Sequence, residues 1–217
     1  NNLTGKSEVT LESDYTYSAD TDSAYANGIA VDRELTIDGN GHKITGNNNK
    51  LFAISNTGSL ILKNLVITST YAGETQDDTL ISNSGNLTFD NVSFTVERAL
   101  TKSSSSSCVD LYYNTIVNNA NMIIKNSAFK DSSIKHETAF TSSSTKTYYY
   151  GLIYNNGASS NLEIENTKFD NNQLSSSLKI GSTISFALLV HNEKGTAKLN
   201  NVLISNNYVN YNPQANP

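Results

Sequence analysis

The stretch Leu162-Glu-Ile-Glu-Asn166-Thr-Lys-Phe169 contains the pattern that decides the fold. Its apolar residues alternate with polar ones up to an Asn, and such alternation is typical of a β-strand with one buried face. The pattern apolar-x-apolar-x-Asn-x-x-apolar recurs at residues 60–67, 87–94, 122–129 and 197–204. Its first half occurs at residues 35–39, where Gly39 takes the place of the Asn. The chain is therefore a tandem repeat.

A second short apolar segment precedes each repeat and ends in a bend rich in Asn and Gly, residues that tolerate left-handed backbone angles. These segments lie at residues 51–58, 80–85, 115–120, 152–157 and 188–192. The repeated Asn residues are 27, 35, 40 and 35 positions apart along the sequence. The shortest step fits one turn of a parallel β-solenoid, whose coils stack about 4.8 Å apart. We therefore predict an all-β solenoid of about six or seven coils.

A stacked coil gives the recurring Asn a structural role, because a corner or inward Asn can hydrogen-bond to its copies in the coils above and below. We favour this interpretation strongly over a catalytic role for these residues. The predicted structural ladder consists of Asn64, Asn91, Asn126, Asn166 and Asn201.

Composition excludes several classes of protein. The chain has 217 residues, 37% of them hydrophobic, with one Cys and a formal net charge of −5. One Cys forms no intrachain disulfide, and the acidic balance with only Arg33 and Arg98 argues against a nucleic-acid partner. No apolar run reaches the ~18 residues of a membrane span.

The expected domain organisation is simple. Residues 1–34 differ from the repeats and are expected to cap the N-terminal end of the solenoid, which would otherwise expose its core and strand edges. Residues 35–207 form the predicted solenoid. Residues 208–217 are expected to be a tail or a linker to a longer chain.

The extra length of the longer repeats always enters between one repeat and the apolar segment of the next. We expect these insertions to emerge on one side of the rod, where binding surfaces commonly lie. Tyr offers broad contact area and a polar tip, which suits recognition of a glycan or protein. An alternative, weighed equally, is that some of these aromatic residues flank strand ends and cover the solenoid. The candidate binding residues are Tyr71, Tyr112, Tyr113, Phe140, Tyr148, Tyr149 and Tyr150.

A polysaccharide-cleaving enzyme on this scaffold would need clustered carboxylates beside a basic residue. The candidates, which share no repeat position, are Asp77, Asp78, Asp110, Asp131, Glu137, Asp170 and Arg98. The three His residues lack metal-ligand spacing, and the cap carboxylates Asp14, Asp20 and Asp22 lack the order of a calcium loop. We therefore expect no enzyme activity, cofactor or metal.

Several of these segments resemble the right-handed parallel β-helix of large adhesin-like surface proteins, notably those of methanogenic archaea. The resemblance is carried by residues 35–44 with 60–67, by residues 153–157 with 162–172, and by the opening residues 9–17. The Phe-x-x-Asn element at Phe169–Asn172 is similar to that of chlamydial polymorphic outer-membrane proteins. The same coil pattern also occurs in pectate lyases, so it specifies the fold better than the function.

The resemblance implies a right-handed helix, export, and display on a cell surface as part of a longer protein. It implies an adhesin module that attaches to a glycan or protein of another cell through loops on one side of the rod. The alternatives are a pectate-lyase-like enzyme and a purely structural stalk.

Overall fold

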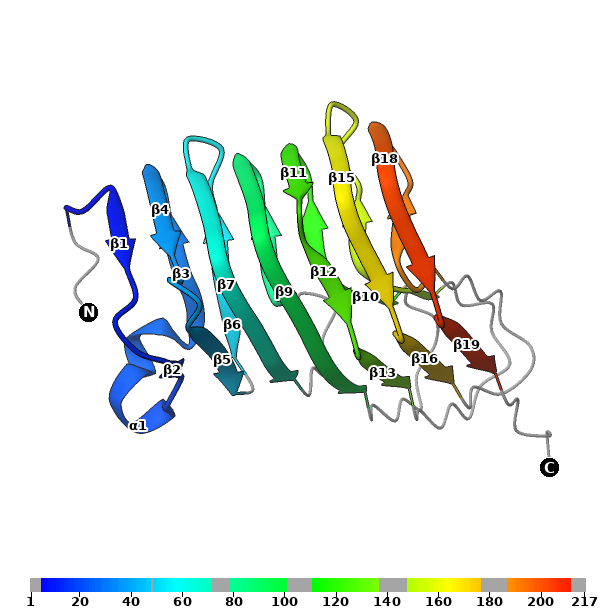
Figure 1. The fold of residues 1–217 in the computed structure, drawn as a ribbon, viewed down its shortest axis with the longest axis horizontal. Coiled ribbons are helices and arrows are strands. Elements are labelled where there is room, and N and C mark those ends of the chain that lie inside the picture. Colours follow the sequence, from blue (N-terminus) through cyan, green and yellow to red (C-terminus); the bar gives the residue numbers. More distant parts are fainter. Residues whose placement is uncertain are drawn as a thin grey trace.

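The computed structural model describes residues 5–47, 49–71, 79–100, 111–136, 148–176 and 187–211. Within these ranges the strands stack side by side along a rod that runs from the N-terminal to the C-terminal end (Figure 1). All pairings between neighbouring strands are parallel and join one coil to the next. The predicted all-β parallel β-helix is confirmed.

The first sheet runs the length of the rod. Its leading strands, in order, are β1 (Glu8–Thr10), β4 (Glu34–Asp38), β7 (Ser59–Tyr71), β9 (Asn86–Leu100), β11 (Asn121–Lys125), β15 (Asn161–Asp170) and β18 (Thr196–Ser205). It continues around a bend into β2 (Tyr15–Thr16), β5 (Lys43–Asn47), β12 (Ala128–Lys130), β13 (Ser133–His136), β16 (Gln173–Ser176) and β19 (Tyr208–Tyr211). In the described chain, seven strands therefore stack along the leading face, in keeping with the predicted six or seven coils.

The second sheet closes the other side of each coil. It consists of β3 (Asn27–Val31), β6 (Lys50–Ile54), β8 (Ile81–Asn83), β10 (Leu111–Asn118), β14 (Tyr148–Asn155) and β17 (Val190–Asn192). The five apolar segments predicted upstream of the repeats lie in this sheet or in the turns that follow its strands. Each coil is thus a strand of the second sheet, a turn, and then a bent strand of the first sheet.

The core forms because each coil places its apolar residues directly over those of the coil before. Leu60 pairs with Leu87, and Leu62 pairs with Phe89, in the register of β7 and β9. These four side chains are almost completely buried, and the intervening residues of β7 point outward. Burial of such side chains stabilises a fold by about 1.5–3 kcal/mol each, so stacking of like residues holds the rod together without a disulfide.

The outward positions just before the corner carry alternating charges. Asp38, Lys63, Asp90, Lys125 and Glu165 occupy successive coils at one register position. Lys63 Nζ lies 3.4 Å from Asp38 Oδ2, and Lys125 Nζ lies 3.2 Å from Asp90 Oδ2. Opposite charges are therefore neighbours along the rod axis.

Strands of the first sheet extend into both expected end regions. In the expected cap, β1 and β2 pair in parallel with β4 and β5, and α1 (Ala19–Asp22) and the 3-10 helix η1 (Ser23–Tyr25) follow. The first sheet therefore continues into the expected cap, and a short helix follows these strands. At the other end β19 pairs with β16, so the solenoid reaches Tyr211 instead of ending at residue 207. The alternation in Tyr208–Tyr211 is short, which hid this strand in the sequence.

Candidate ligand-binding groove

The recurring Asn residues form the corner of the first sheet. Asn64, Asn91, Asn126, Asn166 and Asn201 have φ angles of 51°, 57°, 52°, 48° and 49°. This left-handed conformation is strained for most residues but is accessible to Asn, whose short side chain bonds locally. Each Asn therefore turns the chain at the same point of its coil, which explains why the residue recurs.

The predicted Asn ladder is present in part, and it lies on the outside of the rod. The Asn91 side chain donates to the Asn64 amide oxygen at 3.0 Å, and Asn201 donates to Asn166 at 2.7 Å. Asn126 donates instead to the Asp90 carboxylate at 3.0 Å. All five amides are exposed. The corner Asn residues thus leave hydrogen-bonding groups available to a ligand.

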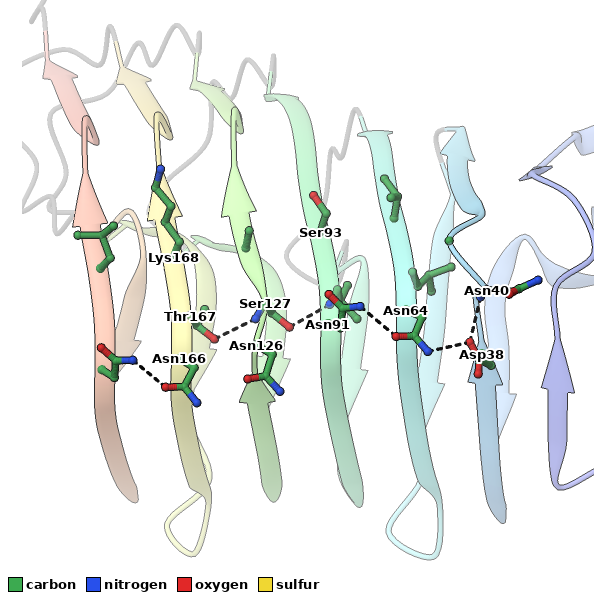
Figure 2. A pocket seen from close by; sticks show the side chains of 17 residues that line it. Asp38, Asn40, Asn64, Asn91, Ser93, Asn126, Ser127, Asn166, Thr167 and Lys168 are labelled. Carbon is green, nitrogen blue, oxygen red and sulfur yellow. Dashed lines mark hydrogen bonds between the residues drawn. The ribbon is translucent and has the colours of Figure 1, made fainter.

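These corners line an open groove of about 750 Å³ that extends along the rod axis (Figure 2). Its described lining residues come from six consecutive coils: Asp38, Asn40, Gly41, Asn64, Leu65, Val66, Asn91, Val92, Ser93, Asn126, Ser127, Ala128, Asn166, Thr167, Lys168, Asn201 and Leu203. The groove arises because the chain bends at each Asn, so the strand segments on either side of the corner form its walls.

Buried hydroxyl groups hold the floor of the groove in the later coils. The Ser127 hydroxyl accepts the backbone N–H of Val92 at 3.1 Å, and the Thr167 hydroxyl accepts that of Ser127 at 3.4 Å. Both hydroxyls also donate to carbonyls of their own strands. Buried backbone groups need hydrogen-bond partners, so the Ser127 and Thr167 hydroxyl groups stabilise the bend of the chain at the floor of the groove.

The charge of the groove is nearly balanced. Among the lining residues that the structure describes, Asp38 carries the one carboxylate and Lys168 the one ammonium group. The backbone N–H of Asn40 and the side chain of Asn64 lower the pKa of the Asp38 carboxyl below its ordinary value. Lys168 is paired with Asp170 at 2.8 Å. Asn amides and small side chains fill the space between these two charges.

The geometry suits an extended ligand better than a compact one. Amide groups that donate and accept recur from coil to coil at the strand spacing of about 4.8 Å. Apolar side chains such as Val66 and Leu203 lie beside them. A polymer with regularly spaced hydroxyl or amide groups and short apolar surfaces would meet similar contacts in each coil.

A second Asn ladder, which the sequence analysis missed, is buried in the second sheet. Asn83 donates to Asn118 at 2.7 Å, Asn118 donates to Asn155 at 2.7 Å, and Asn155 donates to Asn192 at 2.6 Å. Asn83, Asn118 and Asn155 are fully buried. The sequence alone indicates only a bend at these residues. Their spacings of 35, 37 and 37 positions were the available signal.

The predicted aromatic site is divided between several environments. Tyr71 is only 8% exposed, at the end of β7, and the Arg98 guanidinium lies 5.4 Å from the centre of its ring. Tyr112 and Tyr113 of β10 pair with Tyr149 and Tyr150 of β14. Tyr148 pairs with Leu111. The backbones of these Tyr residues thus lie in strands, not in the insertions where they were expected. Phe140 lies outside the described residues.

The carboxylates considered for an enzyme have structural partners wherever they are described. Asp131 lies at a second left-handed corner, with φ of 54°, and accepts a hydrogen bond from Asn171. Asp170 accepts hydrogen bonds from Ser205 and Asn206. Arg98 is buried beside Tyr71. Asp77, Asp78, Asp110 and Glu137 lie outside the described residues.

The cap carboxylates and the histidines also have local roles. Asp14 accepts the backbone N–H of Lys43 and lies 3.4 Å from His42 Nδ1, while Asp22 accepts the N–H of Ser18. His191 stacks on Tyr154. The described part of the chain contains no group of three His, Cys, Asp or Glu residues arranged to hold a metal ion.

A smaller and mainly apolar cavity of about 190 Å³ lies at the N-terminal end, between the core and Tyr15, Tyr17 and Tyr25. Asp14 and Asp22 lie at its edge, where both accept the backbone hydrogen bonds described above. The groove is therefore the larger and more accessible of these two candidate sites.

No protein-family model and no curated protein matches this chain. Among solved structures, it is similar to the SRRP of L. reuteri 53608, with 14% sequence identity and a TM-score of 0.34, over 96% of this chain and 92% of that chain. In the described residues, the helices are too short and too polar to cross a membrane.

Proposed function

We propose that this chain is a non-enzymatic adhesin module that is displayed on a cell surface and binds an extended glycan along the groove. The observation that carries the proposal is the row of exposed corner amides that lines the groove over successive coils. The resemblance of the repeats to adhesin-like surface proteins supports the same class of function.

The expected partner is a surface glycan, or a glycosylated protein, of another cell. Hydroxyl groups of a sugar can both donate to and accept from an Asn amide, and the apolar face of a sugar ring can lie against Val66 and the exposed Leu203. The near balance of charge along the groove favours a neutral polymer. Extracellular location within a longer exported protein follows from this proposal.

Binding is tested by a glycan array and a cell-attachment assay with the wild type and two matched variants. Ser93→Arg places a long side chain in the groove, whereas Thr88→Arg places the same side chain on the flat outer face of the same strand, β9. Both native side chains are half-buried. We expect Ser93→Arg to reduce binding at least about tenfold, a loss of roughly 1.4 kcal/mol, and Thr88→Arg to leave it unchanged.

Further measurements distinguish the proposed function from the alternatives. Equal binding by both Arg variants, with loss on replacing Tyr148 to Tyr150 by Ser, would move the site to β14. Failure of the wild type to bind any glycan or cell would favour a structural stalk. Incubation with pectin and other polysaccharides, followed by measurement of new reducing or unsaturated chain ends, tests for an enzyme, and cleavage would contradict the proposal.

A further inference from the structure

The C-terminal end of the rod exposes side chains at positions that are buried in the coils from β7 to β16. In the register of β15 with β18, Leu199 stacks on Ile164 and Ile204 stacks on Phe169. Val209 of β19 stacks on Leu174 of β16 in the same way. Leu199, Ile204 and Val209 are exposed, whereas the three residues beneath them are buried. The stacked apolar positions of the core therefore continue into the last described coil, where their side chains are exposed. We call Leu199, Ile204 and Val209 the end face.

Exposure of the end face differs from exposure of ordinary surface residues. Leu203 and Ile204 are neighbours on β18 and are both 57% exposed. Leu203 occupies the outward register of Lys168 and lines the groove, while Ile204 occupies the inward register of Phe169. Only Ile204 thus belongs to the stacking surface between coils.

The buried Asn ladder also ends at this face. In its interior, Asn118 has an Asn neighbour in the coil on each side. Asn192 has such a neighbour only in Asn155. One more Asn beside Asn192 would continue this ladder.

The opposite end of the rod is closed differently. Val9, Leu11 and Tyr17 of the first coil are buried, and α1 and η1 follow them. A polar cover of this type protects a terminal coil, and an open apolar end with an unpaired strand is prone to association. The two ends of the rod are therefore not equivalent.

We propose that the end face is a docking surface for one further coil of the same parallel repeat. The coil would place apolar residues over Leu199, Ile204 and Val209 and an Asn beside Asn192. The end face continues an existing interface. The same contact between neighbouring coils is already formed six times along the leading strands of the described chain, from β1 to β18. A membrane, a second copy or an unrelated protein would cover the apolar residues but would not supply an Asn that continues the ladder.

The experiment joins a copy of residues 80–100, which contain β8 and β9, to Pro217 of the full chain. In the added copy Arg98 is replaced by Leu, because Arg98 occupies the register position of Leu174 and Val209. This copy supplies the pattern of one coil with Leu87, Phe89 and Phe94 at its inward positions. The control carries Ser at these three positions of the added copy only. Hydrogen exchange of the β18 amides and the thermal unfolding midpoint are measured for both proteins and for the original chain.

We expect the apolar copy to slow exchange in β18 by about tenfold or more and to raise the midpoint, because the edge strand and core become covered. The Ser copy should do neither. In the host chain, Ile204→Ser should abolish the gain, while Leu203→Ser should preserve it. Unchanged exchange with the apolar copy, equal protection by the Ser copy, or equal effects of the two host substitutions would overturn the proposal. A second copy is the occupant instead if sedimentation shows dimers of the original chain that persist when the apolar coil is added.

Discussion

Asparagine has two distinct tasks in this chain, and backbone conformation and burial separate them. At the exposed corner, Asn adopts a left-handed φ and turns the strand, as at Asn126. In the second sheet, Asn118 is buried and its amide links neighbouring coils. The first task depends on the backbone, whereas the second depends on the amide. The same residue type is therefore expected to respond differently to mutation at the two positions.

Replacing Asn118 with Ala should lower the free energy of unfolding by about 3 kcal/mol, because the buried Asn155 amide oxygen loses its donor and the buried Asn83 amide nitrogen loses one of its two acceptors. The matched variant is Asn126→Gly, which keeps the left-handed turn and removes only an exposed hydrogen bond, and it should cost less than about 1 kcal/mol. Urea denaturation followed by circular dichroism measures both. Equal losses would contradict the distinction between buried and exposed ladders.

Asp170 makes stability depend on pH. Hydrogen bonds from Lys168 and Ser205 lower the pKa of its carboxyl to about 2, from 3.8. Because the pKa is lower in the folded state, the folded state binds fewer protons than the unfolded state. Stability is therefore lost as the pH falls from about 3.8 towards 2. We expect the urea midpoint to decrease between about pH 5 and pH 2, and to decrease less in Asp170→Asn. Lys168→Met should reduce the dependence in the same direction, and an unchanged slope in Asp170→Asn would refute this assignment.

Sequence reasoning located the corner Asn residues but not their orientation. The alternation of apolar residues identifies the faces of a strand, yet it stops at the corner, where the backbone changes conformation. Nothing in the pattern around Asn126 distinguishes an inward amide from an outward one. The buried series was harder to recognise because Asn83 and Asn118 lie next to turn residues, which gave a sufficient local explanation.

At the scale of elements, the repeat predicted the strands and their stacking. The five predicted repeats correspond to β7, β9, β11 with β12, β15 and β18. The prediction was wrong at the start of β10 and β14. Uniform runs such as Tyr148-Tyr149-Tyr150 have no alternation, so the sequence did not show that these strands begin within the presumed insertions. Pairing with the neighbouring coil extends the strands there.

A stack of Phe rings links three coils at one register position. Phe129 lies between Phe94 and Phe169, with ring centroids 5.2 Å and 5.1 Å apart. All three rings are buried. Aromatic pairs at this distance add to the stabilisation that burial provides.

Phe129→Ala should destabilise the chain by about 3–5 kcal/mol, because it opens a cavity and interrupts the ring stack. Phe129→Leu retains most of the apolar volume and should cost less than half as much. Thermal and urea unfolding of the two variants provide the comparison. A loss of less than about 1 kcal/mol for Phe129→Ala would show that neighbouring coils collapse into the space.

At the scale of the whole molecule, each coil is stabilised by its two neighbours. Stability in such an array is approximately a sum of coil and interface contributions, so its ends are the weakest parts. The sequence established this architecture from the spacing of the Asn residues. It could not establish the open end face, because the inward residues of the last coil match those of buried coils.

Hydrogen exchange of the unmodified chain should therefore be graded along the rod. We expect the greatest protection in β9 and β11, which have neighbours on both sides, and the least in β18 and β19. Exchange measured by mass spectrometry at peptide level can resolve this order. Uniform protection of all four strands would mean that the rod opens only as one cooperative unit.

The alternating charges beside the corner have a consequence for how the rod assembles. If a coil were omitted during folding, Lys63 would lie next to Lys125, and Asp38 next to Asp90. Repeats with similar apolar patterns could otherwise exchange places at little cost, whereas like charges in direct contact along a strand ladder are destabilising. The row of charges thus disfavours arrangements in which one coil between β4 and β15 is skipped.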